Sequence, residues 1–319
     1  MGRGVRRAAA SVLFVLAALS VIYIAYRYAG PGPLEVPVTV VIPKGAGVTE
    51  IAGLLATSHV LAMPWLFRVA VRLQDVDASL RAGEYRFAVH ESMHSVIARL
   101  RDVVVRRLTV PEGMSSGQVV ALLRQTEELE GEIVATPPEG TLLPETYTYT
   151  LGDTRNELLR RMASAMTAAL DEAWAAREPG LPLKTPRDAV ILASIVEKET
   201  ALAAERPRVA AVFLNRLQQG MRLQADPTVA YAVNGGDPSE RPLTLTDLQY
   251  ASPYNTYVTD GLPPGPIANP GRASLVAVLH PMHSDELYFV ADGTGGHAFA
   301  RTLQEHQRNV ARWRKRNGD

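Results

Sequence analysis

The hydrophobic pattern of this 319-residue chain begins with one long apolar run. No charged residue occurs from Ala8 to Tyr26, and about 20 apolar residues are enough for a helix to cross a bilayer. Arginines precede the run and tyrosines cluster at its far end, as at a membrane interface. The pattern predicts a cytoplasmic N-terminus over 1–7, a transmembrane anchor over 8–28, and an extracytoplasmic remainder. A cleaved signal peptide is the alternative, but its apolar core is typically only 7 to 15 residues.

After a Gly- and Pro-rich linker over 29–35, a strand–turn–helix pattern occurs twice. Residues 36–42 are rich in β-branched side chains and predict a strand, and 49–61 have apolar residues at helical spacing. The same layout recurs further along the chain with a constant offset. The matched positions are Ile42/Val110, Pro43/Pro111, Gly45/Gly113, Ile51/Val119, Leu54/Leu122 and Leu55/Leu123.

The first copy continues into a small module. Residues 83–87 predict a further strand and 92–100 a short helix, so 36–105 is expected to be a small α+β module. Its strand–helix–helix–strand layout resembles the LysM fold, a glycan-binding module of cell-wall proteins. Residues 106–135 are then a second strand–turn–helix unit or connector. Both copies could equally be plain structural units.

A Pro/Gly-rich boundary at 136–140 opens a larger region, 136–319. An aromatic turn or strand is expected over 142–149, followed by helices at about 154–176, 185–202 and 205–219. Thr185 as N-cap, Pro186 at the first helical position and Asp188 in the first turn each favour the start of the second helix. The fold class is therefore α+β: a transmembrane helix, the LysM-like module and a larger mixed α+β domain.

Composition narrows the possible functions. The chain has 33 basic and 33 acidic residues, but 1–28 carry four arginines and no acid, which leaves the remainder with a formal charge of −4. A mildly acidic domain argues against nucleic acid as a partner. The chain has no cysteine, which excludes disulfides and thiolate metal sites.

The run ILASIVEKET, residues 191–200, places two carboxylates in an otherwise apolar helix. A buried acid has its charged form disfavoured, which suits acid–base chemistry. Residues two apart lie about 200° apart on a helix, so Glu197 and Glu199 cannot act together. Glu197 shares its face with the small Ala193 and Ser194, which leave room for a substrate, and is the predicted catalytic group. Glu199, among larger aliphatics, is predicted to be a supporting acid, with Ser194 beside the site.

Polar and aromatic residues follow this helix in several loops. Aromatic rings stack on sugar rings, and amides and hydroxyls can bind sugar hydroxyls. The predicted substrate-binding residues are Gln224, Asp226, Tyr254, Asn255 and Tyr257. Each loop taken alone could also be an ordinary surface turn.

Six long motifs follow one another in the second half of the chain: SIVEKETA (194–201), VFLNRL (212–217), MRLQADPTV (221–229), YNTY (254–257), GLPPGPI (261–267) and LYFVADGTGGHAF (287–299). Over about residues 139–305 they resemble the endolytic murein transglycosylases, the MltG or YceG-like family. The resemblance implies a bacterial inner-membrane enzyme that cleaves the β-1,4 bond between N-acetylmuramic acid and N-acetylglucosamine in nascent peptidoglycan and leaves a 1,6-anhydromuramic end. It implies no cofactor, and a peptidoglycan synthase (penicillin-binding protein) as partner.

By motif, the family's catalytic glutamate is expected at Glu197, in agreement with the helical-face argument. One carboxylate is enough for this chemistry, because the C6 hydroxyl of the substrate is the nucleophile. The segment LPETY at 143–147 departs from the family pattern, which leaves the role of Glu145 open.

Three alternatives remain. A hydrolytic muramidase would need a second carboxylate, Asp226 or Glu145. A non-catalytic glycan-binding scaffold would act through 36–105. A metal site at His280 and His283 with Asp285 nearby is disfavoured, because Pro281 interrupts the ligand pair and no second cluster completes a shell. These two histidines and His297 are expected to be structural or surface residues.

Overall fold

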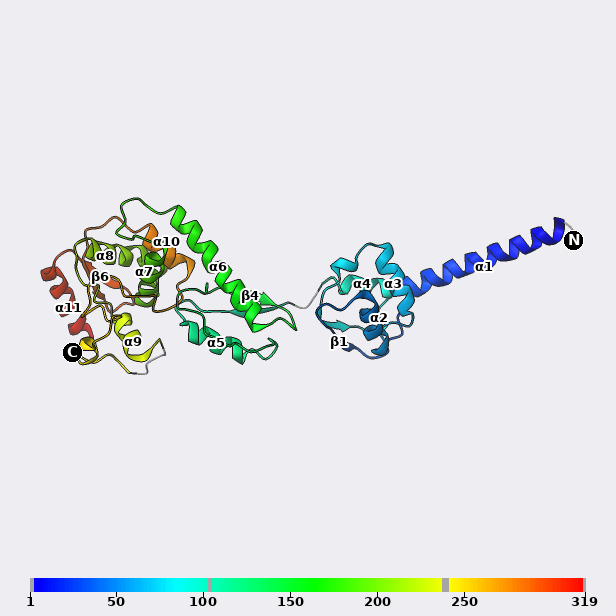
Figure 1. Cartoon of the computed structure of the whole chain (residues 1–319), viewed down its shortest axis with the longest axis horizontal. Coiled ribbons are helices and arrows are strands. Elements are labelled where there is room, and N and C mark those ends of the chain that lie inside the picture. The colour runs from blue at the N-terminus through cyan, green and yellow to red at the C-terminus, as the bar shows by residue number, and fades with distance from the viewer. Residues whose placement is uncertain (1–2, 103–104, 237–240, 318–319) are drawn as a thin grey trace. The chain divides into compact units, whose positions relative to one another are not determined.

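The computed structural model describes residues 3–102, 105–236 and 241–317, and the side chains of 11–316 within these ranges. The chain divides into two compact units (Figure 1). Unit 1 comprises Met1–Arg106 and Thr148–Asp153, and unit 2 comprises Arg107–Tyr147 and Thr154–Asp319. The predicted segment 1–7 includes residues 1–2, and the predicted boundary after residue 105 follows residues 103–104. Both pairs lie outside the described residues.

Unit 1 begins with the expected apolar helix, α1, Arg3–Ala29. Its part from Ser11 to Ala29 is long and apolar enough to cross a membrane, and none of this stretch is buried against the protein. Figure 1 shows α1 projecting from the rest of unit 1. Such a helix is consistent with single-pass anchoring.

The rest of unit 1 is a small α+β fold. Its elements are β1 (Val38–Ile42), α2 (Val48–Thr57), α3 (Pro64–Leu73), a 3-10 turn (Asp77–Ser79), β2 (Gly83–Phe87) and α4 (Met93–Arg99). β1 and β2 pair antiparallel with Val40 opposite Tyr85, and α2, α3 and α4 enclose a core that includes Leu55, Phe67 and Phe87. The predicted strands at 36–42 and 83–87 and the helices at 49–61 and 92–100 are confirmed, with α2 ending four residues earlier than expected, whereas α3 was not predicted. The likeness to LysM stays a prediction.

The predicted repeat is present as a repeated backbone turn. The second copy consists of β3 (Arg106–Thr109) and α5 (Ser116–Gln125), and β3 pairs with β4 (Thr146–Tyr149). Gly45 and Gly113, at the same place in the two turns, have positive φ angles of 81° and 77°. A residue with a side chain would be strained there, which explains why glycine occurs in both copies.

Unit 2 is built around helices. They are α5, α6 (Arg155–Ala175), α7 (Pro186–Glu199), α8 (Arg206–Gln218), α9 (Asp226–Asn234), α10 (Arg272–Leu279) and α11 (Leu303–Asn317), with 3-10 turns at Ala203–Glu205 and Asp247–Gln249. β5 (Tyr288–Ala291) and β6 (His297–Ala300) form an antiparallel hairpin. The fold class is thus mixed α+β, as predicted.

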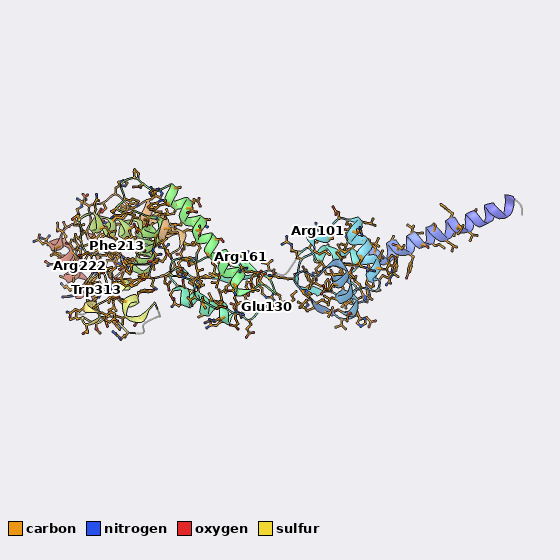
Figure 2. All side chains as sticks on the ribbon, viewed as in Figure 1. Arg101, Glu130, Arg161, Phe213, Arg222 and Trp313 are labelled. Atoms are coloured by element: carbon orange, nitrogen blue, oxygen red, sulfur yellow. The ribbon has the colours of Figure 1, made fainter. Side chains whose placement is uncertain are left out.

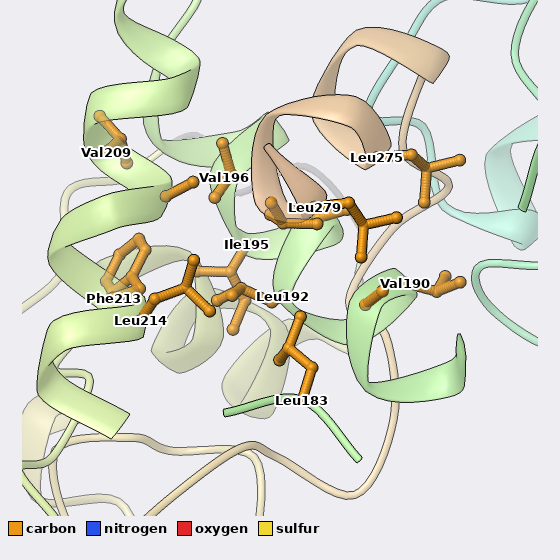
Figure 3. Packing of buried hydrophobic residues seen from close by; sticks show 14 of the residues in the cluster. Leu183, Val190, Leu192, Ile195, Val196, Val209, Phe213, Leu214, Leu275 and Leu279 are labelled. Atoms are coloured by element: carbon orange, nitrogen blue, oxygen red, sulfur yellow. The ribbon is translucent and has the colours of Figure 1, made fainter. Parts of the chain in front are cut away.

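Helix α7 lies at the centre of unit 2. Every residue from Ala189 to Val196 is buried, and α7 packs against α8, α10, α6 and α9. Figure 3 shows its apolar side chains between those of α8 and α10, and Figure 2 places Phe213 of α8 in the same unit. Burial on all sides matches the nearly continuous apolar run in the sequence.

The ends of α7 follow from local sequence. The Thr185 hydroxyl accepts a hydrogen bond from the Asp188 backbone N–H, and the Asp188 carboxylate accepts one from the Thr185 backbone N–H, a capping box that confirms the predicted start. Thr200 is extended, so the helix ends at Glu199, three residues earlier than predicted. Glu199 is therefore the last helical residue, at the edge of the core.

Candidate active site

Both oxygens of the predicted catalytic residue, Glu197, are engaged in structural contacts. Oε1 accepts a hydrogen bond from Arg206 Nη2 at 2.8 Å, and Oε2 accepts one from the Gly271 amide at 2.9 Å. Its side chain is only 4% exposed. Arg206 also donates to Glu112 Oε2 at 2.9 Å, so one guanidinium joins two carboxylates. Both carboxylate oxygens of Glu197 therefore already accept a hydrogen bond from the protein.

Glu199 is placed differently. It lies on the wall of a cavity of about 310 Å³, together with three of the predicted substrate-binding residues, Gln224, Asp226 and Tyr257. Within the described ranges its carboxylate accepts no hydrogen bond. The two acids of α7 thus point to different surroundings, as the helical geometry requires. The one expected to be a supporting acid is the one in the cavity.

The surroundings of Glu199 favour its protonated form. Burial raises the pKa of its carboxyl to about 8, the charge of Asp226 raises it further, and the charge of Arg216 opposes the shift. The last turn of α7 adds in the same direction, because a helix C-terminus carries partial negative charge. A carboxyl with such a pKa can donate a proton near neutral pH and take one back.

Asp226 is held beside Tyr257 by a buried network of threonines. Tyr257 Oη donates to Asp226 Oδ1 at 2.5 Å, and Thr256 Oγ1 lies 2.9 Å from Thr228 Oγ1. Thr256 Oγ1 also accepts from the Ala225 amide at 3.0 Å. Burial and the Asp226 carboxylate raise the pKa of Tyr257, which remains a neutral donor. These bonds join the start of α9 to the YNTY segment and form one wall of the cavity.

Gln224 carries backbone strain at this wall. Its φ angle is +49°, a left-handed conformation that is uncommon for a residue other than glycine. The backbone N–H of Gln224 donates to the Thr256 carbonyl at 3.1 Å, and this bond holds Gln224 in the strained conformation. Strained residues of this kind are concentrated at functional sites. Gln224 and Asp226 were expected in a loop, but α9 already begins at Asp226.

Four other predicted residues do not line this cavity. Asn255 is fully buried, donates to the Leu248 and Tyr250 carbonyls and accepts from the Tyr257 amide, so it positions Tyr257. Tyr254 packs on Tyr231, with ring centroids 4.9 Å apart.

Ser194 and Glu145 have structural partners instead. Ser194 Oγ donates to the Ile191 carbonyl and accepts from the Ile267 amide at 3.0 Å, which fixes the Pro/Gly-rich loop against α7. Glu145 forms an ion pair with Arg272 at 2.7 Å and is 41% exposed. Neither contact supports direct contact with a substrate in the Glu199 cavity.

Sequence reasoning missed several residues of the cavity wall, among them Arg216, Phe289 and His306. Arg216 is 8% exposed and donates to the Leu287 and Leu223 carbonyls, each at 2.6 Å, so it ties the hairpin to the start of α9. Burial and Arg216 lower the pKa of His306, and its buried Nδ1 has no hydrogen-bond partner within the described residues. Arg216 lies in the motif VFLNRL, but nothing local marks His306.

The three histidines expected to be structural or surface residues have acidic neighbours. His297 lines the cavity, with Nδ1 2.6 Å from Glu205 Oε2, and its pairing lowers the pKa of Glu205. His280 and His283 lie 3.9 and 3.7 Å from the Glu178 carboxylate. In the described part of the chain, no three potential ligands are grouped as a metal would require.

This chain is similar to a known protein family and to named proteins of two bacteria. The model of the YceG-like family matches residues 40–312. A protein of Bacillus subtilis named endolytic murein transglycosylase is 31% identical over 304 residues, which cover 85% of this chain and 83% of that protein. A Streptococcus pneumoniae protein of the same name is 29% identical over 322 residues, and the match covers 86% of this chain but 58% of that longer protein.

A solved structure agrees with these matches. The crystal structure of a YceG-like protein from Listeria monocytogenes superposes with a TM-score of 0.53 at 28% identity, covering 85% of this chain and 98% of that one. The family match covers both the α+β part of unit 1 and the cavity of unit 2. The chain therefore belongs to the YceG-like family.

Proposed function

We propose that this protein is an endolytic murein transglycosylase with Glu199 as its single catalytic acid and base. The observation that carries the proposal is a carboxyl with a pKa of about 8 on the wall of a polar cavity. The names of the Bacillus and Streptococcus relatives supply the substrate class, peptidoglycan. The finer proposal is cleavage of the β-1,4 bond between N-acetylmuramic acid and N-acetylglucosamine in nascent strands, with a 1,6-anhydromuramic end as product.

The reaction needs one proton donor that becomes a proton acceptor. Protonated Glu199 donates to the glycosidic oxygen while the bond from that oxygen to C1 of the muramic residue breaks. The resulting carboxylate takes the proton from the C6 hydroxyl of the same residue, and O6 forms a bond to C1. The carboxyl is regenerated and no water is consumed. A raised pKa serves both halves, because the group must be protonated at the start and basic afterwards.

Asp226, Tyr257 and Gln224 are proposed to bind the substrate around Glu199. Asp226 Oδ1 accepts a hydrogen bond from Tyr257, which leaves Oδ2 to accept one from a sugar hydroxyl. Neutral His306, with an unpartnered Nδ1, offers a further contact to a hydroxyl or an acetamido group. Tyr254 and Asn255 are proposed to act through the position of Tyr257 rather than by touching sugar.

Glu197 is proposed to position the site and not to react. Its contacts join α7 to Arg206 at the start of α8 and to Gly271 before α10. Removing the Glu197 carboxylate would leave the buried Arg206 guanidinium with only Glu112 of its two carboxylate partners, which would destabilise the fold. The catalytic proposal therefore passes from Glu197 to Glu199, because Glu197 is bonded to Arg206 and Gly271 whereas Glu199 lines the cavity.

The decisive experiment compares Glu199→Gln with Glu197→Gln, a matched change two residues away on the same helix. Purified full-length protein is given un-crosslinked glycan strands, and the products are identified by mass spectrometry. Glu199→Gln is expected to release no anhydro-ended fragments while retaining a folded circular dichroism spectrum. Glu197→Gln is expected to retain cleavage in the folded fraction. The reverse pattern would restore Glu197 as the catalytic residue.

A hydrolytic muramidase is the second candidate, because Asp226 lines the same cavity as Glu199. A hydrolase would use Asp226 to activate water or to attack C1. Digestion in water enriched in oxygen-18 separates the two reactions. A transglycosylase yields anhydro ends without the heavy isotope, whereas a hydrolase yields labelled reducing ends. Glu145 is less suited to this role because Arg272 already pairs with it outside the cavity.

We also propose that α1 anchors the protein in the bacterial cytoplasmic membrane, with its N-terminus in the cytoplasm. This would place the active site near new glycan strands and near a peptidoglycan synthase. Whether the α+β part of unit 1 binds glycan, as a LysM-like module would, is separable from catalysis. Deletion of residues 36–105 with Glu199 intact tests the scaffold alternative, which predicts that only the deletion abolishes strand binding.

A further inference from the structure

Helix α3 in unit 1 exposes an unusual apolar stripe. Trp65, Val69 and Leu73 are 47%, 45% and 83% exposed. They are four residues apart in turn, so they lie on one face of the helix. The opposite face is ordinary core, since Phe67 and Val71 are fully buried. A contiguous apolar face of this kind on a small domain needs a partner.

The stripe is continuous with the proposed membrane anchor. A groove of about 450 Å³ lies between α1 and α3, lined by Val21 and Ile24 of the anchor and by Leu66, Val69 and Leu73 of α3. Figure 1 shows α3 close to the Ala29 end of α1. Apolar surface therefore runs from the anchor onto α3 without a polar break.

Hydrogen bonds hold the two helices in this arrangement. Gln74 Nε2, just after α3, donates to Tyr28 Oη at 3.0 Å, and the same hydroxyl lies 2.8 Å from His94 Nδ1 of α4. Tyr28 also packs edge-on against the His94 ring. The orientation of α3 relative to the anchor is therefore set by specific contacts.

The depth of the groove matches the outer part of a bilayer. Val21 precedes Tyr28 by seven residues, which places it about 10 Å deeper along the anchor, at 1.5 Å per residue. Tyrosine at the end of a span lies at the headgroup level. Amphipathic helices in the plane of a membrane are embedded by about 5–10 Å below that level. The stripe on α3 is thus at the depth of such a helix.

The charges on α3 fit the same surface. At 100° per residue, Arg68 and Arg72 lie beside Trp65 on the edge of the apolar stripe away from Leu66. Both are exposed, and neither side chain has a hydrogen bond or ion pair in the described part of the chain. Arginine with its alkyl stem on apolar surface and its guanidinium at phosphate level is typical of interfacial helices.

We propose that α3 is a membrane-surface helix, embedded through Trp65, Val69 and Leu73 in the leaflet at the Ala29 end of α1, with Arg68 and Arg72 on the phosphates of anionic lipids. The inference rests on the anchoring proposed above and is independent of the catalytic proposal. The consequence is that the α+β part of unit 1 is held against the membrane at two places, α1 and α3. The contact through α3 would restrict rotation of this part of unit 1 about the end of α1.

Fluorescence of Trp65 tests the proposal in the full-length protein reconstituted in phosphatidylglycerol vesicles. Lipids brominated near the top of the acyl chains quench tryptophan at that depth. The Trp65 signal is the difference between the wild-type protein and Trp65→Phe, which leaves the other two tryptophans unchanged. We expect roughly a twofold loss of the Trp65 emission in brominated lipid, and roughly half that loss for Arg68→Gln/Arg72→Gln.

The controls separate the possible failures. Carbonate extraction shows first whether the protein is integral to the vesicles. If it is extracted, the anchoring and this inference both fail. If it stays but the Trp65 signal is quenched by aqueous iodide and not by brominated lipid, α3 is in water and the inference alone fails. A blue-shifted Trp65 signal that neither agent quenches would show that a second copy or another protein covers the stripe, which also overturns the proposal.

Discussion

Glu199→Gln is expected to stabilise unit 2, and the gain should grow with pH. Burial raises the pKa of Glu199 from 4.5 to about 8. Between these pH values the folded protein keeps this proton while the unfolded chain releases it. Because the unfolded state then binds fewer protons, the free energy of unfolding falls as pH rises. Glutamine resembles the neutral acid and has no proton to lose, so the variant escapes this loss.

The size of the effect follows from the width of that window. Each pH unit across it corresponds to about 1.4 kcal/mol, so the variant gains at most about 3 kcal/mol near pH 7 and about 5 kcal/mol above pH 8. Solvent in the cavity screens part of the charge, which makes these values upper limits. Below pH 4.5, Glu199 is protonated in both the folded and the unfolded protein, and the stability gained by Glu199→Gln should vanish.

The measurement is urea unfolding of the full-length protein in detergent at several pH values. A Trp65→Phe background leaves Trp174 and Trp313, both in unit 2, as the fluorescent reporters. Glu197→Gln is the matched control and should destabilise unit 2 throughout, because it weakens a buried ion pair. A gain from Glu199→Gln that does not change between about pH 5 and 8 would refute the assignment of the raised pKa.

Three further outcomes are expected. Wild-type activity should fall as pH rises through about 8, because Glu199 must be protonated to donate. Asp226→Asn should move this fall in activity to lower pH, because the Asp226 charge is one cause of the raised pKa of Glu199. Initial rates of anhydro-end release measured against pH test both outcomes. Arg206→Met should lower the free energy of unfolding by about 3–5 kcal/mol, since it leaves Glu197 buried without its cation; a loss under about 1 kcal/mol would show that the pair is dispensable. Thr185→Ala should cost about 1 kcal/mol through the lost N-cap, and Thr185→Ser, which keeps the hydroxyl, should cost much less.

Local sequence signals were sufficient for most of the fold. The repeated strand–turn–helix units were visible because glycine is needed at the left-handed turn position in both copies. The start of α7 was visible because Thr185, Pro186 and Asp188 each act within one helical turn. The end of α7 was missed, because no glycine marks it; Thr200 is extended there, and its hydroxyl accepts from the Leu202 backbone N–H and donates to Glu205.

The residues of the candidate site were only partly predictable, because some of them are brought together by the fold and not by neighbouring sequence. Gln224, Asp226 and Tyr257 stand out in the sequence as polar groups between apolar segments, and all three line the Glu199 cavity. His306 was not, since it comes to the cavity from α11, far along the chain, and only the folded structure brings it there. Asn255 and Tyr254 share a motif with Tyr257, and sequence alone does not separate a residue that lines a site from one that positions it.

The choice between Glu197 and Glu199 shows where helical periodicity stops being informative. Periodicity correctly separates the two acids, but it also predicts space for a substrate from the small neighbours on the face of Glu197. In the folded protein that space is filled by the Arg206 guanidinium and the Gly271 backbone. The larger aliphatic neighbours of Glu199 predict packing, and burial raises the pKa of its carboxyl. The proposal for Glu199 therefore rests on its burial at the cavity wall and on the absence, among the described residues, of a cation in hydrogen-bonding contact with it, and the paired glutamine variants test it.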